Sequence, residues 1–139
     1  MTITKSEPIA PWYAFDLDGT LAFYDGFKGH TEIGAPIEPM VQLVFKYLAE
    51  GKIVKIFTAR AAEPDPKRRL EVLEAIARWS LDVFDVALPV TCMKDYGMVE
   101  LYDDRCKQVI PNTGLLVEDV LKECEEAYSN VSYQLTGGR

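Results

Sequence analysis

The stretch that decides the fold is residues 11–21, PWYAFDLDGTL. Its first half, which ends at Phe15, is short, apolar and rich in aromatic residues, a composition that favours a buried β-strand. Its second half changes abruptly to Asp16 and Asp18, followed by Gly19, a threonine and a leucine. Asp16 and Asp18 therefore fall at the end of the predicted strand, and parallel α/β sheets bind ligands beyond the carboxyl ends of their strands.

Outward from this stretch, helix and strand patterns alternate along the chain. Helical spacing predicts a helix over residues 36–50, a strand follows over 52–58, and Asp65 and Pro66 open a second helix as N-cap and first residue. Further strands are predicted at 84–90 and 98–102, with a short edge strand at 108–110 and a last helix over 114–128. The alternation predicts an α/β fold: a Rossmann-like three-layer α/β/α sandwich with a central parallel sheet covered on both faces.

The composition is that of an ordinary globular protein. The chain has 139 residues, 48% of them hydrophobic and 27% charged, which predicts a single domain over 1–139 whose ends, 1–10 and 130–139, are flexible. The net charge of −7 argues against non-specific binding to nucleic acids or to anionic membranes.

We find no apolar run of membrane-spanning length, and the three cysteines form no Cys-x-x-Cys pair, so we expect a cytoplasmic protein with reduced thiols. The oligomeric state is left open.

Polar residues capable of chemistry fall at the ends of four predicted strands. They are Asp16 and Asp18, Thr58, Lys94, and the pair Asp103 and Asp104. Because parallel strands bring their carboxyl ends to one edge of the sheet, we expect these side chains to share a crevice. Clustered carboxylates repel one another unless a cation lies among them, and oxygen ligands without histidine or cysteine favour Mg²⁺. Together with a lysine and a hydroxyl group, such a site suits phosphoryl transfer.

The order and spacing of these residues carry a resemblance to a known family. The run Asp16-Leu17-Asp18-Gly19-Thr20-Leu21, followed by Thr58, Lys94 and Asp103-Asp104, resembles the four-motif signature of the haloacid dehalogenase-like superfamily, over residues 12–110. The resemblance implies a Mg²⁺-dependent phosphatase that hydrolyses a phosphomonoester through an aspartyl-phosphate intermediate. Asp16 would be the nucleophile and Asp18 the general acid and base.

The resemblance also implies roles for the other motif residues. Phosphate would be bound by Gly19, Thr58, Ala59, Arg60 and Lys94, and Mg²⁺ by Asp16, the backbone carbonyl of Asp18, Asp103 and, through water, Asp104. Arg60 could instead pair with an acidic residue, and its role and that of His30 stay open. Relatives often have a proline after the lysine of the third motif, where this chain has Asp95.

Members of this superfamily often carry a cap domain after the first motif or between the second and third. Here the predicted helices and strands nearly fill both intervals, so we expect no cap domain and only a short flap over residues 22–35. Within the flap, Asp25 and Gly26 predict a hairpin turn. Two other functions stay open: a non-enzymatic module that binds metal or phosphate, and a phosphatase specific for polynucleotide or nucleotide phosphate ends.

Overall fold

The computed structural model describes residues 8–135, with side chains up to residue 131. The expectation of flexible ends concerns mainly residues outside this range. The chain divides into two compact units, Met1–Asp104 and Arg105–Arg139, and the boundary falls directly after the acidic pair. The prediction that residues 1–139 form one domain stays a prediction.

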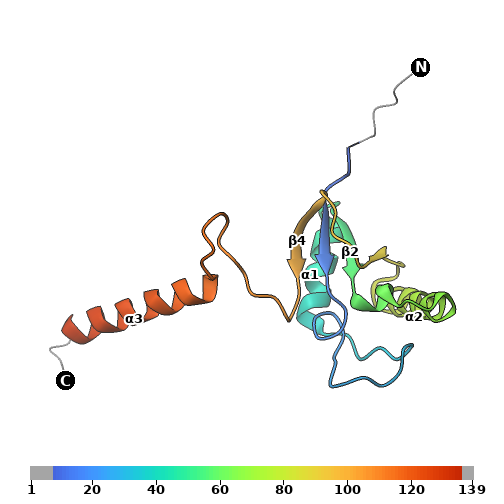
Figure 1. Ribbon diagram of the computed structural model, residues 1–139, viewed down its shortest axis with the longest axis horizontal. Helices are drawn as coiled ribbons and strands as arrows, with labels where there is room; N and C mark the ends of the chain where they lie inside the picture. The colour runs from blue at the N-terminus through green and yellow to red at the C-terminus, as the bar shows by residue number, and fades with distance from the viewer. Residues whose placement is uncertain (1–7, 136–139) are drawn as a thin grey trace, which may run out of the picture. The chain divides into compact units, whose positions relative to one another are not determined.

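The sheet of the first unit has four parallel strands within the described residues (Figure 1). They are β1 (Trp12–Phe15), β2 (Ile53–Phe57), β3 (Val90–Thr91) and β4 (Met98–Tyr102), in the order β3-β2-β1-β4. The strand β1 is central and pairs in parallel with both β2 and β4, so that Phe15 lies in register with Ile56 on one side and Tyr102 on the other. This confirms the prediction of an α/β fold with a parallel sheet.

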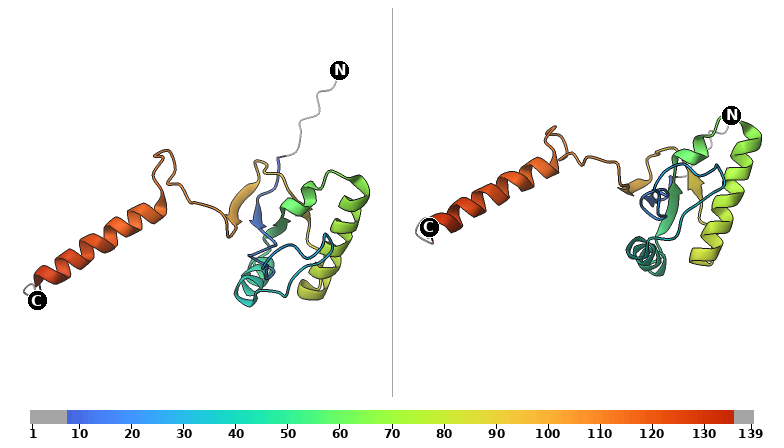
Figure 2. Two further views of the ribbon diagram at one scale, coloured as in Figure 1. Left: turned by 60° about the horizontal axis from the view of Figure 1, so that its bottom comes forward. Right: turned by 90° about the horizontal axis from the view of Figure 1, so that it is seen from below.

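Two long helices and one short 3₁₀ helix connect these strands. The helix α1 (Glu38–Ala49) joins β1 to β2, and the 3₁₀ helix η1 (Ala59–Ala62) and α2 (Pro66–Phe84) join β2 to β3, as Figure 2 shows from two directions. At the start of α2 the Asp65 side chain accepts a hydrogen bond of 2.9 Å from the backbone N–H of Arg68, and Pro66 is the first helical residue. The predicted N-cap is therefore confirmed.

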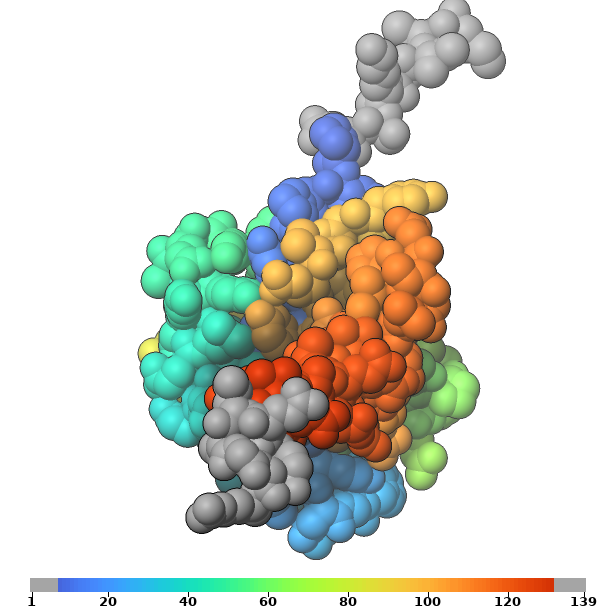
Figure 3. Space-filling model, turned by 90° about the vertical axis from the view of Figure 1, so that its left-hand side faces the viewer, coloured from blue at the N-terminus to red at the C-terminus, as the bar shows by residue number. Residues whose placement is uncertain are grey.

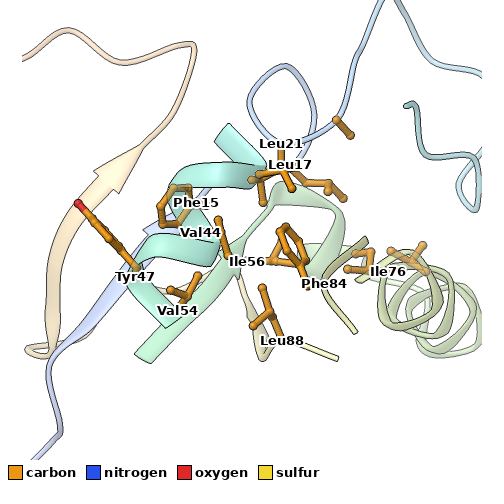
Figure 4. Close-up of a cluster of buried hydrophobic side chains, with 13 residues drawn as sticks. Phe15, Leu17, Leu21, Val44, Tyr47, Val54, Ile56, Ile76, Phe84 and Leu88 are labelled. Carbon is orange, nitrogen blue, oxygen red and sulfur yellow. The ribbon is translucent and has the colours of Figure 1, made fainter. Parts of the chain in front are cut away.

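Both long helices pack into one hydrophobic core (Figure 4). Val44 of α1 and Ile76 of α2 are fully buried with Phe15 and Ile56, whose side chains share one face of the sheet because they are in register. Residues 8–104 thus show helices packed against this face, and a layer of helix on the opposite face stays a prediction.

The core also fixes the loop that follows β1. Leu17 and Leu21 are both fully buried in the same cluster. Each of the two residues flanking Leu17 is an aspartate, so burying this leucine holds the backbone of Asp16 and Asp18 at the end of the strand. Removing such a leucine typically costs about 2–5 kcal/mol, so the acidic loop is anchored by the core.

The strand predicted at 84–90 is wrong except at its last residue, Val90, where β3 begins. Phe84 is instead the last residue of α2, where it is 4% exposed and contacts the rings of Phe45 and Trp79 edge-on. Asp85 ends the helix in the left-handed conformation, with φ of 59°. Only the two residues of β3 pair with β2. An apolar run at the end of a long amphipathic helix cannot be distinguished from a strand by pattern alone.

Two smaller expectations also differ from the structure. The edge strand predicted at 108–110 is reduced to one isolated antiparallel bridge, between Val109 and Leu116. The flap has no hairpin strands: residues 25 and 26 form a bend, and the limbs of the flap meet through one isolated bridge between Ala22 and Pro36.

The second unit consists of a loop and one helix. The helix α3 (Val117–Leu135), orange to red in the space-filling view of Figure 3, begins three residues after the predicted start at 114 and extends beyond the predicted end at 128. Before it, Lys107 forms an ion pair of 2.8 Å with Glu118. In the described part of the chain, no helix has the length and apolar character needed to cross a membrane.

Candidate active site

Three aspartates meet at the carboxyl ends of β1 and β4. Asp16 directly follows β1, and its backbone N–H donates a 2.9 Å hydrogen bond to the carbonyl oxygen of Tyr102, the last residue of β4. The next two residues along the chain are Asp103 and Asp104. One carboxylate oxygen from each aspartate lies within 4.8 Å of the others. We call Asp16, Asp103 and Asp104 the acidic cluster.

Burial and the neighbouring carboxyl groups raise the pKa of Asp16 to about 7 from an ordinary value of 3.8. Burial is the largest cause, followed by the negative charge of Asp103 and a hydrogen bond with Asp104; the backbone amide of Leu17 acts in the opposite direction. A carboxyl group held next to two others favours either a proton or a cation. Carboxylate oxygens, without histidine or cysteine, are the ligands that Mg²⁺ prefers. The residues of the cluster therefore fit a magnesium ion.

Gly19 is required by the geometry of this loop. Its φ is +86°, a conformation that other L-residues rarely adopt, and a Cβ atom there would lie 2.4 Å from Oδ2 of Asp104. Its backbone N–H donates a 2.8 Å hydrogen bond to the carbonyl oxygen of Ala22, which closes the turn. Glycine therefore lets the loop after β1 approach the carboxylate of Asp104.

The Asp18 side chain is not part of the acidic cluster and binds Arg60 instead. The Nε and Nη2 atoms of Arg60 donate to the two carboxylate oxygens of Asp18 at 2.7 and 2.8 Å, and both side chains are largely buried. The same guanidinium group donates to the carbonyl oxygens of His30 at 3.2 Å and Glu32 at 2.7 Å. Bidentate pairs of this type fix both position and orientation. Arg60 therefore joins Asp18 to the flap.

The sequence did not identify this pairing. It left open whether Arg60 binds the substrate or pairs with an acidic residue. The structure shows the acidic partner, and it is Asp18. One signal in the sequence pointed to it: Arg60 lies two residues after the strand-terminal Thr58, so it emerges at the same edge of the sheet as Asp18. In this arrangement four of the five guanidinium N–H groups donate to Asp18 and the flap.

Thr58 lies at the end of β2, where it is 2% exposed. Its backbone N–H donates to the carbonyl oxygen of Thr91 at 2.9 Å, which ties it to β3. Its Oγ1 accepts a 3.1 Å hydrogen bond from the backbone N–H of Arg60 and so caps η1, which begins at the exposed Ala59. A hydroxyl group that accepts can still donate its own proton. Thr58 is thus positioned with a donor available for an anion.

Lys94 lies on the connection between β3 and β4 and is exposed. In residues 8–131 its side chain makes no hydrogen bond or ion pair. The next residue, Asp95, accepts hydrogen bonds from Nε1 of Trp12 at 2.7 Å and from the backbone N–H of Gly97 at 2.8 Å. Trp12 begins β1, whereas Asp16 follows its end. The structure does not join Lys94 to the acidic cluster, and its phosphate-binding role stays a prediction.

The flap is anchored at several points. At its base, the backbone N–H of Phe23 donates to the carbonyl oxygen of Ala35 at 2.8 Å, and a Cβ atom on Gly34 would lie 1.9 Å from the carbonyl oxygen of Phe23. Gly34 also accepts a 3.0 Å hydrogen bond from Nε1 of Trp79 on α2. Near the tip, His30 and Glu71 of α2 form a contact of 2.6 Å between Nε2 and Oε2. The flap is therefore fastened to α2 and to Arg60.

No protein-family model, no curated protein and no solved structure matches this chain. The resemblance to the haloacid dehalogenase-like superfamily therefore depends on the residues of this chain alone. Any function must be argued from the side chains at the ends of β1, β2 and β4.

Proposed function

We propose that the protein is a Mg²⁺-dependent phosphatase of the haloacid dehalogenase-like type, which hydrolyses a phosphomonoester through an aspartyl-phosphate on Asp16. The arrangement of four aspartates at the end of the sheet carries this proposal. Asp16 shares the acidic cluster with Asp103 and Asp104, while Asp18, only two residues later, binds Arg60 instead. Two carboxyl groups in such different surroundings are suited to different roles, one as nucleophile and the other as acid and base.

In the first step, a carboxylate oxygen of Asp16 attacks the phosphorus atom. A bond forms between that oxygen and phosphorus as the ester P–O bond breaks, and the leaving oxygen takes a proton from Asp18. For this step Asp18 must carry a proton on one oxygen, while the other oxygen can remain with Arg60. The products are the free alcohol and the aspartyl-phosphate.

In the second step, Asp18 acts as a base. It takes a proton from a water molecule, whose oxygen attacks phosphorus, and the bond between phosphorus and Asp16 breaks to release inorganic phosphate. Asp18 is available as a base in this step because it has already given its proton to the leaving alcohol in the first step. The cycle restores both carboxyl groups.

Other parts of the site support the same chemistry. Asp16, Asp103 and Asp104 would hold Mg²⁺, which supplies positive charge against the negative charges of the cluster and of the phosphoryl group. Thr58 would donate its hydroxyl proton to a phosphate oxygen, and Lys94 would add a positive charge after a movement of its connection. We also propose that the flap takes the place of a separate cap domain.

The test is a phosphatase screen over sugar phosphates, nucleotides, phosphopeptides and phosphorylated oligonucleotides. Each substrate is measured with Mg²⁺, with EDTA, and with the Asp16→Asn variant. Asp82→Asn, which changes an exposed carboxylate on α2, is the matched control. We expect hydrolysis that needs Mg²⁺, is lost by Asp16→Asn and is unchanged by Asp82→Asn.

Two results would contradict the proposal. Undiminished turnover in EDTA or in Asp16→Asn would exclude this mechanism. If no phosphomonoester is hydrolysed while calorimetry shows that Mg²⁺ binds the wild-type protein and not Asp16→Asn, the protein is instead a metal-binding module.

A further inference from the structure

Two cavities adjoin Asp18 on its flap side. They have volumes of about 260 and 170 Å³. Asp18, Tyr24 and Arg60 line both cavities, so the two cavities adjoin the same three side chains. Phe23 contributes to the larger one and Phe27 to the smaller one. The pair of cavities therefore has the acid and base of the proposed reaction at one end and aromatic rings of the flap at its walls.

Three aromatic rings of the flap are exposed. Phe23, Tyr24 and Phe27 are 60, 41 and 77% exposed, although the backbone around them is fastened at its base and near its tip. Aromatic side chains that are exposed together contribute little to the core and often mark binding sites. Here they surround a cavity, so a small ligand that stacks on them would bury them.

The position of Asp18 determines which part of a substrate reaches these cavities. A general acid must lie within hydrogen-bond reach of the oxygen that it protonates. The phosphoryl group faces Asp16 and the acidic cluster, so the alcohol part of the substrate extends from Asp18 toward the flap. This step rests on the proposed phosphatase function.

We infer that the two cavities bind the nucleoside part of a nucleoside monophosphate, with its base stacked on the aromatic rings of the flap. Stacking on a planar base is the interaction that exposed tyrosine and phenylalanine rings provide best. A sugar alone has no planar face to stack on these rings, and the polar side chains that line the cavities, such as Glu32 and Glu63, are equally available to the ribose of a nucleotide. The net charge of −7 disfavours a polynucleotide more strongly than a free nucleotide, which carries fewer phosphate charges.

The experiment compares kcat/KM for 5′-AMP and for ribose 5-phosphate, both with Mg²⁺. These substrates carry the same type of phosphate ester and differ by the base. Stacking predicts a preference for 5′-AMP of about tenfold or more, because one base on an aromatic ring contributes about that factor. Tyr24→Ala lowers this preference by about fivefold or more, and Tyr24→Phe, which keeps the ring, retains it.

The control variant is Tyr96→Ala. Tyr96 is fully exposed on the connection between β3 and β4, near residues that contact the start of β1, so its removal leaves the preference unchanged. Phosphorylated oligonucleotides form a separate arm of the experiment. If they are hydrolysed more efficiently than 5′-AMP, the ligand is a strand end, and the assignment to a free nucleotide is overturned.

The outcomes separate this inference from the proposed function. Equal kcat/KM for 5′-AMP and ribose 5-phosphate, with both activities lost in Asp16→Asn, overturns the inference and leaves the phosphatase in place. Equal losses on both substrates in Tyr24→Ala give Tyr24 a structural role and also overturn it. Failure to hydrolyse any phosphomonoester overturns both.

Discussion

Replacing Asp16 with asparagine is expected to stabilise the metal-free protein at alkaline pH. Asparagine has nearly the same shape as aspartate and carries no charge, so it removes the repulsion from Asp103 and Asp104. The nucleophile of the proposed reaction would thus be a residue that destabilises the fold when no cation is bound. Functional sites often contain such strain.

The size of the effect follows from the pKa of Asp16, which is raised from 3.8 to about 7. Because the folded protein holds this proton more tightly than the unfolded chain, the associated stability is fully present below pH 3.8 and is lost as the pH rises through 7. The full shift corresponds to about 4 kcal/mol at roughly 1.4 kcal/mol per pKa unit. Asp16 is partly exposed, so solvent screening reduces this to on the order of 1–2 kcal/mol. For a unit of this size we expect a rise in Tm of roughly 5–10 °C.

The assay is thermal unfolding in EDTA at pH 5 and pH 8. At pH 5 only part of this stability is lost, because Asp16 ionises in the unfolded chain above pH 3.8 but stays protonated in the folded protein up to about pH 7. Asp16→Asn therefore unfolds at a slightly higher temperature than the wild type at pH 5 and at a clearly higher temperature at pH 8. Added Mg²⁺ at pH 8 stabilises the wild type more than the variant, because ligands that bind the folded state raise its stability. The reasoning is refuted if the variant gains nothing at pH 8, or gains equally at both pH values.

Three further substitutions test other contacts. Arg60→Lys keeps a positive charge but loses the bidentate geometry at Asp18. We expect it to reduce kcat for alkyl phosphates about tenfold or more. The loss should be smaller for p-nitrophenyl phosphate, because its leaving group needs little protonation. A similar loss on both substrates would argue against positioning of the acid. Gly19→Ala should lower the free energy of unfolding, measured in denaturant, by about 1–3 kcal/mol and should weaken Mg²⁺ binding. The control is Gly51→Ala, because Gly51 also has a positive φ but has open space around it, so this change should affect only stability. Equal Mg²⁺ affinity in the two variants would contradict this prediction. Asp65→Ala should cost about 1 kcal/mol through loss of the helix cap without changing kcat, and an unchanged free energy of unfolding would show that the cap contributes nothing.

The parts of the fold that the sequence predicted correctly depend on local signals. The change from an apolar strand to Asp16 and Asp18 marks the end of β1, and the pair Asp65 and Pro66 marks the start of α2, because caps and strand ends are decided by neighbouring residues. The error at 84–90 arose because Phe84 packs against Phe45 of α1, a contact that no local pattern contains.

The candidate site also contains contacts that the sequence predicted and contacts that it could not predict. The meeting of Asp16 with Asp103 was predictable, because the ends of parallel strands share one edge of the sheet. The partner of Arg60 was not, because the contact with Asp18 spans 42 positions of the chain and depends on the path of the flap. The exposed position of Lys94 depends on the connection between β3 and β4, which the sequence did not reveal.

The most direct test of the central claim is to trap the phosphoryl group on the protein. The enzyme is quenched with acid during turnover of a hydrolysed phosphomonoester with Mg²⁺, treated with borohydride, digested and analysed by mass spectrometry. In a sample without borohydride, we expect a phosphoryl adduct on the peptide that contains Asp16. In the sample treated with borohydride, we expect that adduct to be reduced to homoserine at position 16. Turnover without any adduct at Asp16, or an adduct on another residue, would contradict the account.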